Sequence, residues 1–92
     1  DCSSGGNLPK APVPVGPGYQ VPFSEAIRST GVMTAAVGLI TAPAQADQII
    51  RNQQADIALL GREMLRNPSW ALHAAHALRQ APPVPPQYLR GF

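Results

Sequence analysis

Two glycines stand where short apolar runs give way to helix-like segments, and an arginine follows one of them. Gly38 comes after VMTAAV, and Gly61 comes after DIALL with Arg62 directly behind it. Glycine has no Cβ, so its backbone can approach a ligand closely. The N-terminus of a following helix presents free N–H groups and a partial positive charge. Gly38, Gly61 and Arg62 could therefore hold a phosphate group together.

The same spacing has a plainer interpretation. Both glycines could be simple turns between a strand and a helix, and short motifs of this kind are weak indicators of function by themselves. The residue types alone leave the two alternatives open.

Other side chains that could do chemistry are sparse. Cys2 is the single cysteine, so we expect no disulfide within the chain and no cysteine-ligated zinc site. His73 and His76 lie three apart on one expected helix, and we interpret them as surface residues because further metal ligands are missing. Glu25 and Glu63 have no evident acid–base partner, and we expect them to be solvated or salt-bridged. The sequence thus predicts neither a metal site nor a catalytic pair.

Composition excludes two broad classes of function. The chain has 92 residues, a net charge of +2 and 5% aromatic residues, and its basic residues are scattered. A nucleic-acid groove needs clustered basic and stacking side chains, so we expect no nucleic-acid partner. No apolar run approaches the ~20 residues that span a bilayer, so we expect no membrane segment. Charged residues are only 13%, which indicates that much of the surface is covered by other protein.

Hydrophobic periodicity predicts the order helix, strand, helix, strand, helix. The expected helices cover residues 22–29, 41–52 and 67–79, the expected strands cover 32–37 and 56–60, and one helical turn covers 63–66. We expect Thr41 to cap the second helix and Asn67 the last one. On the second helix, we expect four apolar residues to face inward: Ala42, Ala46, Ile49 and Ile50.

Two segments rich in proline flank these elements. Residues 5–22 contain too many glycines and prolines for a helix or an internal strand, so they form either a linker or an ordered loop at a functional site. The tail, residues 80–92, contains APPVPPQ, and we expect its prolines to hold it extended.

Two apolar strands joined by a helix form a parallel unit. Parallel strands are normally buried on both faces and need flanking strands. Residues 1–4 supply at most one further strand end. We therefore expect the chain to be a piece of a larger α/β protein.

Several motifs occur together along the chain. They are GxxxAxVGLIT, xADxxxLGREMLRNPxW, the closing PxQYxRG, the opening Asp-x-Ser-Ser-Gly-Gly and GPGYQVPFSEAIR. In combination they resemble the bacterial Old Yellow Enzyme family, the FMN-dependent ene-reductases or NADPH dehydrogenases. The resemblance covers essentially all 92 residues.

The resemblance implies the end of strand six through helix eight of a (β/α)₈ TIM barrel, with residues 5–22 as a loop at the barrel mouth. It implies an FMN phosphate site at Gly38, Gly61 and Arg62, with NAD(P)H as reductant and an enal or enone as substrate. The family's catalytic residues lie earlier in the chain, so no catalytic residue is expected in this segment. Cys2 is not the cysteine beside the flavin. We expect a cytoplasmic enzyme.

The resemblance also concerns the tail. In this class the arginine of the closing motif reaches the active site of a neighbouring subunit. It therefore implies a homo-oligomer formed through the tail, with Tyr88 and Arg90 at the interface. The alternative is a frayed terminus, which is the usual state of chain ends.

Two other functions remain alternatives. One is another FMN-dependent barrel, such as a relative of dienoyl-CoA reductases or amine dehydrogenases, although the closing QYLRGF favours the short bacterial class. The other is a non-catalytic interaction fragment that presents APPVPPQY as a polyproline II ligand. The apolar strands and the low charge argue against the second.

Overall fold

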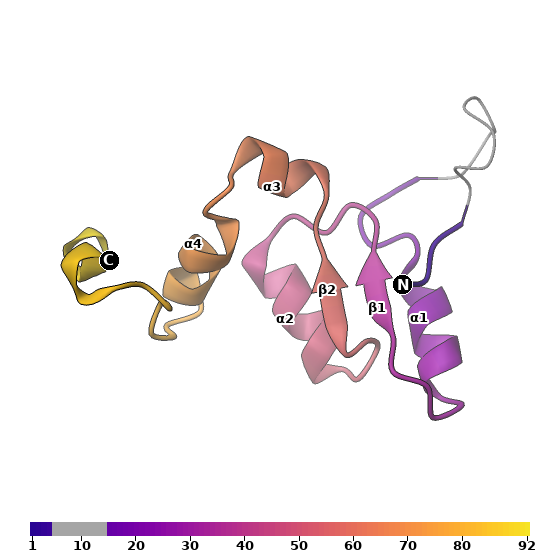
Figure 1. Cartoon of the computed structure of the whole chain (residues 1–92). Coiled ribbons are helices and arrows are strands. Elements are labelled where there is room, and N and C mark those ends of the chain that lie inside the picture. The colour runs from indigo at the N-terminus through magenta and orange to yellow at the C-terminus, as the bar shows by residue number, and fades with distance from the viewer. Residues whose placement is uncertain (5–14) are drawn as a thin grey trace.

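The computed structural model describes residues 1–4 and 15–92, so most of the expected barrel-mouth loop, residues 5–14, lies outside the described residues (Figure 1). The elements are α1 (Val21–Arg28), β1 (Ala35–Val37), α2 (Pro43–Arg51), β2 (Ile57–Leu59), α3 (Arg62–Arg66), α4 (Trp70–Ala77) and a 3₁₀ helix, η1 (Pro86–Gly91). The predicted order of helices and strands is confirmed. The strands are shorter than predicted, at three residues each.

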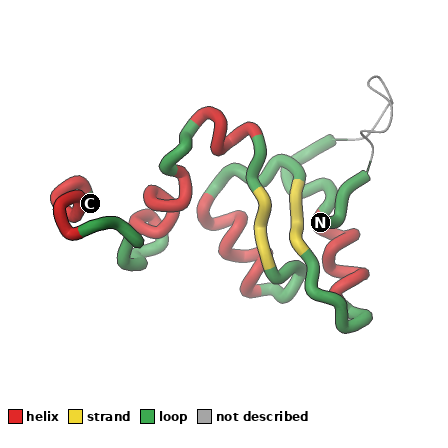
Figure 2. Tube along the Cα trace, in the orientation of Figure 1, coloured by secondary structure: helices red, strands yellow, loops and turns green. Residues whose placement is uncertain are grey.

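The sheet is small and parallel. β1 lies beside β2 (Figure 2), and Ala36 stands opposite Ala58 in their parallel register. Cys2 forms a parallel bridge to Ala36 as well, and its N–H donates to the carbonyl oxygen of Ala35 at 3.1 Å. Since Ala36 meets both partners, Cys2 lies on the edge of β1 opposite β2. The expectation that residues 1–4 supply a strand end is therefore confirmed.

The core lies on the face of the sheet that carries Ala36 and Ala58. Helix α1 packs against β1 and α2 packs against β2. Ala36 is completely buried there. The core consists of small and branched apolar residues from the strands, the helices and their loops: Val21, Ala36, Ile40, Ile49 and Ala55, with Ala46, Ala58 and Leu60 packed against them.

The opposite face of the sheet is bare. Successive strand residues point to opposite faces, so Ala35, Val37, Ile57 and Leu59 share this side. None of them is buried, and Ile57 is 54% exposed. Parallel strands are normally buried on both faces, and no described element covers this one. The uncovered face agrees with the expectation that the chain is a piece of a larger α/β protein.

Both predicted helix caps are wrong. Ala42 rather than Thr41 occupies the N-cap position of α2. The side chain of Gln45 satisfies the first N–H groups, since its Oε1 accepts from Thr41 N–H at 3.0 Å and from Ala42 N–H at 3.5 Å. Ser69 rather than Asn67 occupies the N-cap position of α4, and it makes no side-chain capping bond. Glutamine at the third position thus replaces the expected hydroxyl cap.

The helices bury fewer apolar residues than their pattern predicts. Ile49 of α2 is buried, whereas Ala42 and Ile50 are exposed. On α1, Phe23 and Ile27 are nearly half exposed, and the buried residues are Val21 and the polar Ser24. Ser24 Oγ is satisfied at 2.8 Å by main-chain carbonyl groups, Val21 O in its own helix and Gln54 O before β2.

The end of the tail differs from the extended form expected for residues 80–92. Residues 86–91 form the 3₁₀ helix η1, which begins at Pro86. Proline fits the first turn of a helix because its fixed φ suits that turn and its missing N–H is not needed there.

The chain as a whole is elongated, and η1 lies at the end remote from the sheet (Figure 1). It measures 45 × 32 × 17 Å, with a radius of gyration of 15.0 Å. A compact domain of this length has a radius of gyration of about 12 Å. The arrangement is therefore that of a segment with little interior of its own.

Candidate functional site

A cavity of about 240 Å³ lies beyond the carboxyl ends of the two strands. Its wall is formed by residues from the turn after β1, from the start of α3 and from the segment before α1: Val15, Tyr19, Gly38 to Thr41, Leu59, Gly61 to Glu63, and Arg66. The structure thus brings Gly38, Gly61 and Arg62 to one cavity, because the carboxyl ends of two parallel neighbouring strands lie at the same edge of the sheet. Tyr88 and Arg90 are not among its lining residues and are exposed on η1.

The turn after β1 has an unusual backbone. Gly38 has φ +117° and Leu39 has φ +49°, so two consecutive residues lie in a region that L-residues with side chains rarely adopt. A Cβ on Gly38 would lie 2.8 Å from both Tyr19 Cε1 and Gln20 Nε2. Gly38 is therefore required by its backbone conformation and by the close packing of residues 19–20.

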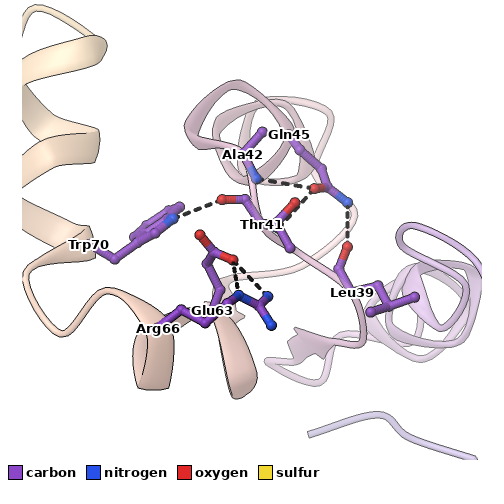
Figure 3. Close-up of polar contacts among 7 residues, drawn as sticks. All are labelled: Leu39, Thr41, Ala42, Gln45, Glu63, Arg66 and Trp70. Carbon is purple, nitrogen blue, oxygen red and sulfur yellow. Dashed lines mark hydrogen bonds and ion pairs between the residues drawn. The ribbon is translucent and has the colours of Figure 1, made fainter.

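Three consecutive carbonyl oxygens of this turn accept hydrogen bonds. Val37 O accepts from Gln20 Nε2 at 2.9 Å, Gly38 O from Gly18 N–H at 3.2 Å, and Leu39 O from Gln45 Nε2 at 3.0 Å (the last in Figure 3). In a trans peptide the N–H points opposite to the carbonyl group of the same unit. The N–H groups of Leu39 and Ile40 therefore point away from these donors, and neither donates a hydrogen bond within the described residues.

Gly61 differs from Gly38 in its surroundings. No atom of the described residues lies within 4 Å of a Cβ built on Gly61, so with respect to these residues its Cα faces open space at the cavity. Within the part of the chain that the structure describes, the N–H groups of Gly61 and Arg62 also donate no hydrogen bond. The main chain at this edge of the cavity is therefore accessible to a ligand, because Gly61 has no side chain to cover it.

The charges around the cavity favour an anion. The Arg62 side chain is exposed and makes no ion pair with a described residue. Glu63 also lines the cavity, but Arg66 Nη2 lies 2.8 Å from its Oε2 and offsets its charge (Figure 3). The expectation that Glu63 is salt-bridged is confirmed. Among the described residues that line the cavity, Arg62 is then the cation that remains available to a ligand.

The main-chain N–H groups at the start of α2 are not available to a ligand, although the N-terminus of a helix usually offers such groups. The N–H groups of Thr41 and Ala42 are already bonded to Gln45 Oε1 (Figure 3). Thr41 O accepts a hydrogen bond from Trp70 Nε1 at 2.7 Å, which attaches α4 to the same loop. The available donors therefore belong to the turn before α2 and to the start of α3.

Sequence reasoning missed Gln20 and Gln45. The spacing of Gln45, three residues after the N-cap, is a capping-box signal that could have identified it. Gln20 has no such signal, because its partners lie 16 and 17 residues away in the sequence.

An ion pair lies at the other end of the strands. Asp56 Oδ2 accepts from Thr34 N–H at 2.8 Å, and Asp56 Oδ1 accepts from Arg28 Nε at 3.1 Å. The Thr34 hydrogen bond, assisted by Arg28 and opposed by desolvation, lowers the pKa of the Asp56 carboxyl. This group joins α1 to both strands, so we interpret it as structural.

The two histidines of α4 lie on the surface, as the sequence predicts. His73 and His76 are exposed, and their rings lie 6.2 and 5.9 Å from the ring of Phe92 between centroids. Over residues 1–4 and 15–92, no three metal-ligand side chains come together. In the same residues, no helix is long and apolar enough to cross a membrane.

Comparison with known proteins identifies relatives of the whole chain. No family model matches. Over 93 aligned residues the chain is 50% identical to an NADPH dehydrogenase of Halalkalibacterium halodurans and 50% identical to one of Geobacillus thermodenitrificans. It is 48% identical to an NADPH dehydrogenase of Listeria monocytogenes. These homologues of about 50% identity over the whole chain are NADPH dehydrogenases of the Old Yellow Enzyme family.

Each alignment covers all of this chain and 27% of the relative. The chain therefore corresponds to a C-terminal segment of longer NADPH dehydrogenases of the Old Yellow Enzyme family. The resemblance drawn from the motifs is confirmed. The parallel β1–β2 unit and the cavity at its carboxyl end are properties of this segment.

Proposed function

We propose that this chain is part of an FMN-dependent NAD(P)H oxidoreductase and holds the FMN phosphate in the cavity beside Gly38, Gly61 and Arg62. The observation that carries the proposal is that one cavity is bordered by accessible main chain at Gly61, main-chain N–H groups without partners among the described residues, and the available guanidinium of Arg62. Main-chain N–H groups and arginine are the common ligands of phosphate.

The size of the cavity fits this assignment. Pockets that enclose whole ligands measure about 300–1,000 Å³, so 240 Å³ suits one end of a flavin nucleotide. Arg62 and the N–H groups of Leu39, Ile40 and Gly61 would hold the phosphate. Bound FMN supplies hydride transfer, while the protein binds and orients it.

We extend the proposal to a TIM barrel in the complete protein. Support comes from the order of three parallel segments, Cys2 beside β1 beside β2, with α1 and α2 on one face. The bare apolar face of β1 and β2 would then point into the barrel, where branched side chains fill the interior. Active sites of this fold lie at the carboxyl ends of the strands, which is where the cavity lies.

The proposed reaction is the reduction of an activated C=C bond, as in an enone or enal, with NAD(P)H as reductant. The names of the relatives support NADPH as the electron source. We assign no catalytic residue to this segment, because the family's substrate-binding residues precede it. A cytoplasmic location is part of the same proposal.

The test uses the complete protein. We expect flavin absorbance in the purified enzyme, and NADPH consumption that depends on 2-cyclohexenone. A colourless protein that cannot be loaded with FMN would contradict the cofactor assignment. Activity with a dienoyl-CoA and none with the enone would favour the other FMN barrel class.

The tail belongs to the same proposal. Tyr88 and Leu89 are large, exposed and apolar on η1, and Arg90 lies beside them. Burying such side chains against a second subunit would contribute about 1.5–3 kcal/mol each. We propose that Tyr88 and Arg90 contact a neighbouring subunit near its substrate site, in a homodimer or a dimer of dimers.

Deletion of residues 87–92 from the complete protein tests this role. We expect a higher KM for the enone and a lower oligomeric mass in sedimentation, with FMN still bound because the tail does not line the cavity. An unchanged KM with an unchanged mass would show that the tail is a passive end.

The alternative of a polyproline II ligand has less support. Pro86 and Gln87 of APPVPPQY belong to η1, so this part of the motif lacks the extended form that such ligands present.

A further inference from the structure

The turn that forms one wall of the cavity is shaped by two glutamines that do not line the cavity. Gln20 is 3% exposed and stands before α1, whereas Gln45 lies in the first turn of α2. Neither belongs to the lining residues. Both side-chain amides nevertheless bond to main-chain groups of the turn after β1.

Each amide uses both of its ends. Gln20 Nε2 donates to Val37 O at 2.9 Å, while its Oε1 accepts from Ser4 N–H at 2.6 Å. Gln45 Nε2 donates to Leu39 O at 3.0 Å, while its Oε1 accepts from Thr41 N–H at 3.0 Å. Reversing either amide would set an oxygen against a carbonyl oxygen and a nitrogen against an N–H donor. Only an amide therefore satisfies both ends.

These bonds fix the direction of the peptide units between residues 37 and 40. Leu39, at φ +49°, is held in a conformation that costs energy for a residue with a side chain. Such a conformation persists only where its surroundings hold it. The Gly38 and Leu39 carbonyl groups, bound to Gly18 and Gln45, direct the N–H groups of Leu39 and Ile40 to the other side. The Gln20 bond to Val37 O fixes the preceding peptide unit, which leads into the turn at Gly38. Successive N–H groups in such a turn form an anion-binding concavity.

We propose that Gln20 and Gln45 are positioning residues of the phosphate site: they hold the Gly38–Leu39 turn so that its N–H groups meet the phosphate, without touching the ligand themselves. The inference rests on the proposed function, since it concerns the same cavity. Replacing either glutamine should then weaken the binding of the flavin's phosphate group and leave the binding of the rest of the flavin unchanged.

Gln45→Met in the complete protein tests this inference. Methionine has a similar length and no charge, and it removes both hydrogen bonds of the amide. We expect the dissociation constant for FMN to rise about tenfold, as for the loss of a hydrogen bond that orders the site. We expect the dissociation constant for riboflavin, which lacks the phosphate, to stay unchanged.

Two further variants complete the design. Gln48→Met is the matched control, because Gln48 lies on the same helix, is exposed and forms no side-chain hydrogen bond with a described residue, so neither constant should change. Gln20→Met should raise the FMN constant as Gln45→Met does. If Gln20→Met does not fold, the result for the less buried Gln45 decides the matter alone.

The outcomes separate this inference from the proposed function. Equal changes for FMN and riboflavin, or no change for FMN, would overturn the positioning role. The proposed phosphate site would still stand in that case, provided that Gly61→Val abolishes FMN binding. If Gly61→Val also leaves FMN binding unchanged, the phosphate site itself is wrongly placed.

Discussion

At the scale of single residues, Gly61 carries the most direct prediction. Its Cα faces open space at the cavity, so a branched side chain would occupy the volume assigned to the phosphate. We expect Gly61→Val to raise the FMN dissociation constant at least about a hundredfold in the complete protein, the effect of losing roughly two hydrogen bonds to a charged group. Arg62→Ala should raise it less, about tenfold, if main-chain N–H groups make the principal contacts. Normal FMN binding by the valine variant would contradict the assignment.

Asp56 carries a prediction on pH. The Thr34 hydrogen bond, and Arg28 beside it, lower the pKa of its carboxyl in the folded protein. The contribution of Asp56 to stability is therefore fully present above its unfolded pKa, about 3.9, and is lost as the pH falls through the lower folded pKa. We expect Asp56→Asn to lower the melting temperature at pH 7 and to reduce the loss of stability below about pH 4.

The control for Asp56 is Asp47→Asn. Asp47 pairs with Arg51 on the surface of α2, and such exposed pairs contribute little. Melting curves of the complete protein between pH 7 and acid would separate the two variants. Identical profiles for both would show that the Asp56 group is as dispensable as a surface pair.

At the scale of the elements, one hydrogen bond attaches α4 to the loop before α2. Trp70 Nε1 donates to Thr41 O at 2.7 Å, and Thr41 is also held by Gln45. Trp70→Phe keeps an aromatic ring and removes this donor. We expect a loss of about 1 kcal/mol in the free energy of unfolding. Denaturant unfolding of the complete protein measures it, and an unchanged midpoint would show that the contact is dispensable.

At the scale of the whole molecule, the isolated 92-residue chain should not fold stably. The sheet is bare on one face, and large apolar side chains such as Met33 and Leu65 are about four-fifths exposed. Exposed strand edges and apolar patches of this kind favour association over a monomeric fold. Size-exclusion chromatography and circular dichroism of the isolated chain would decide it. A cooperative melt of a monomer would contradict the prediction.

The sequence by itself determined the order of the elements and the family. Two apolar runs of four to six residues, each ending at a glycine, are too short for a typical helix and favour short strands, and the intervening segments have helical spacing. The glycines at 38 and 61 marked the strand ends, because a residue without Cβ suits a sharp turn. The motifs that carry the family resemblance are contiguous, so they needed no knowledge of distant contacts.

The tertiary structure alone decided which groups meet. Gln20 reaches Val37 across 17 residues of sequence, because its side-chain amide satisfies a main-chain group that only the folded loop brings near. Burial was likewise decided by neighbours: Ile50, Ile57 and Phe23 carry the apolar pattern of core residues but are exposed in this chain. Periodicity reports which residues share a face, whereas burial depends on whether another layer lies against that face.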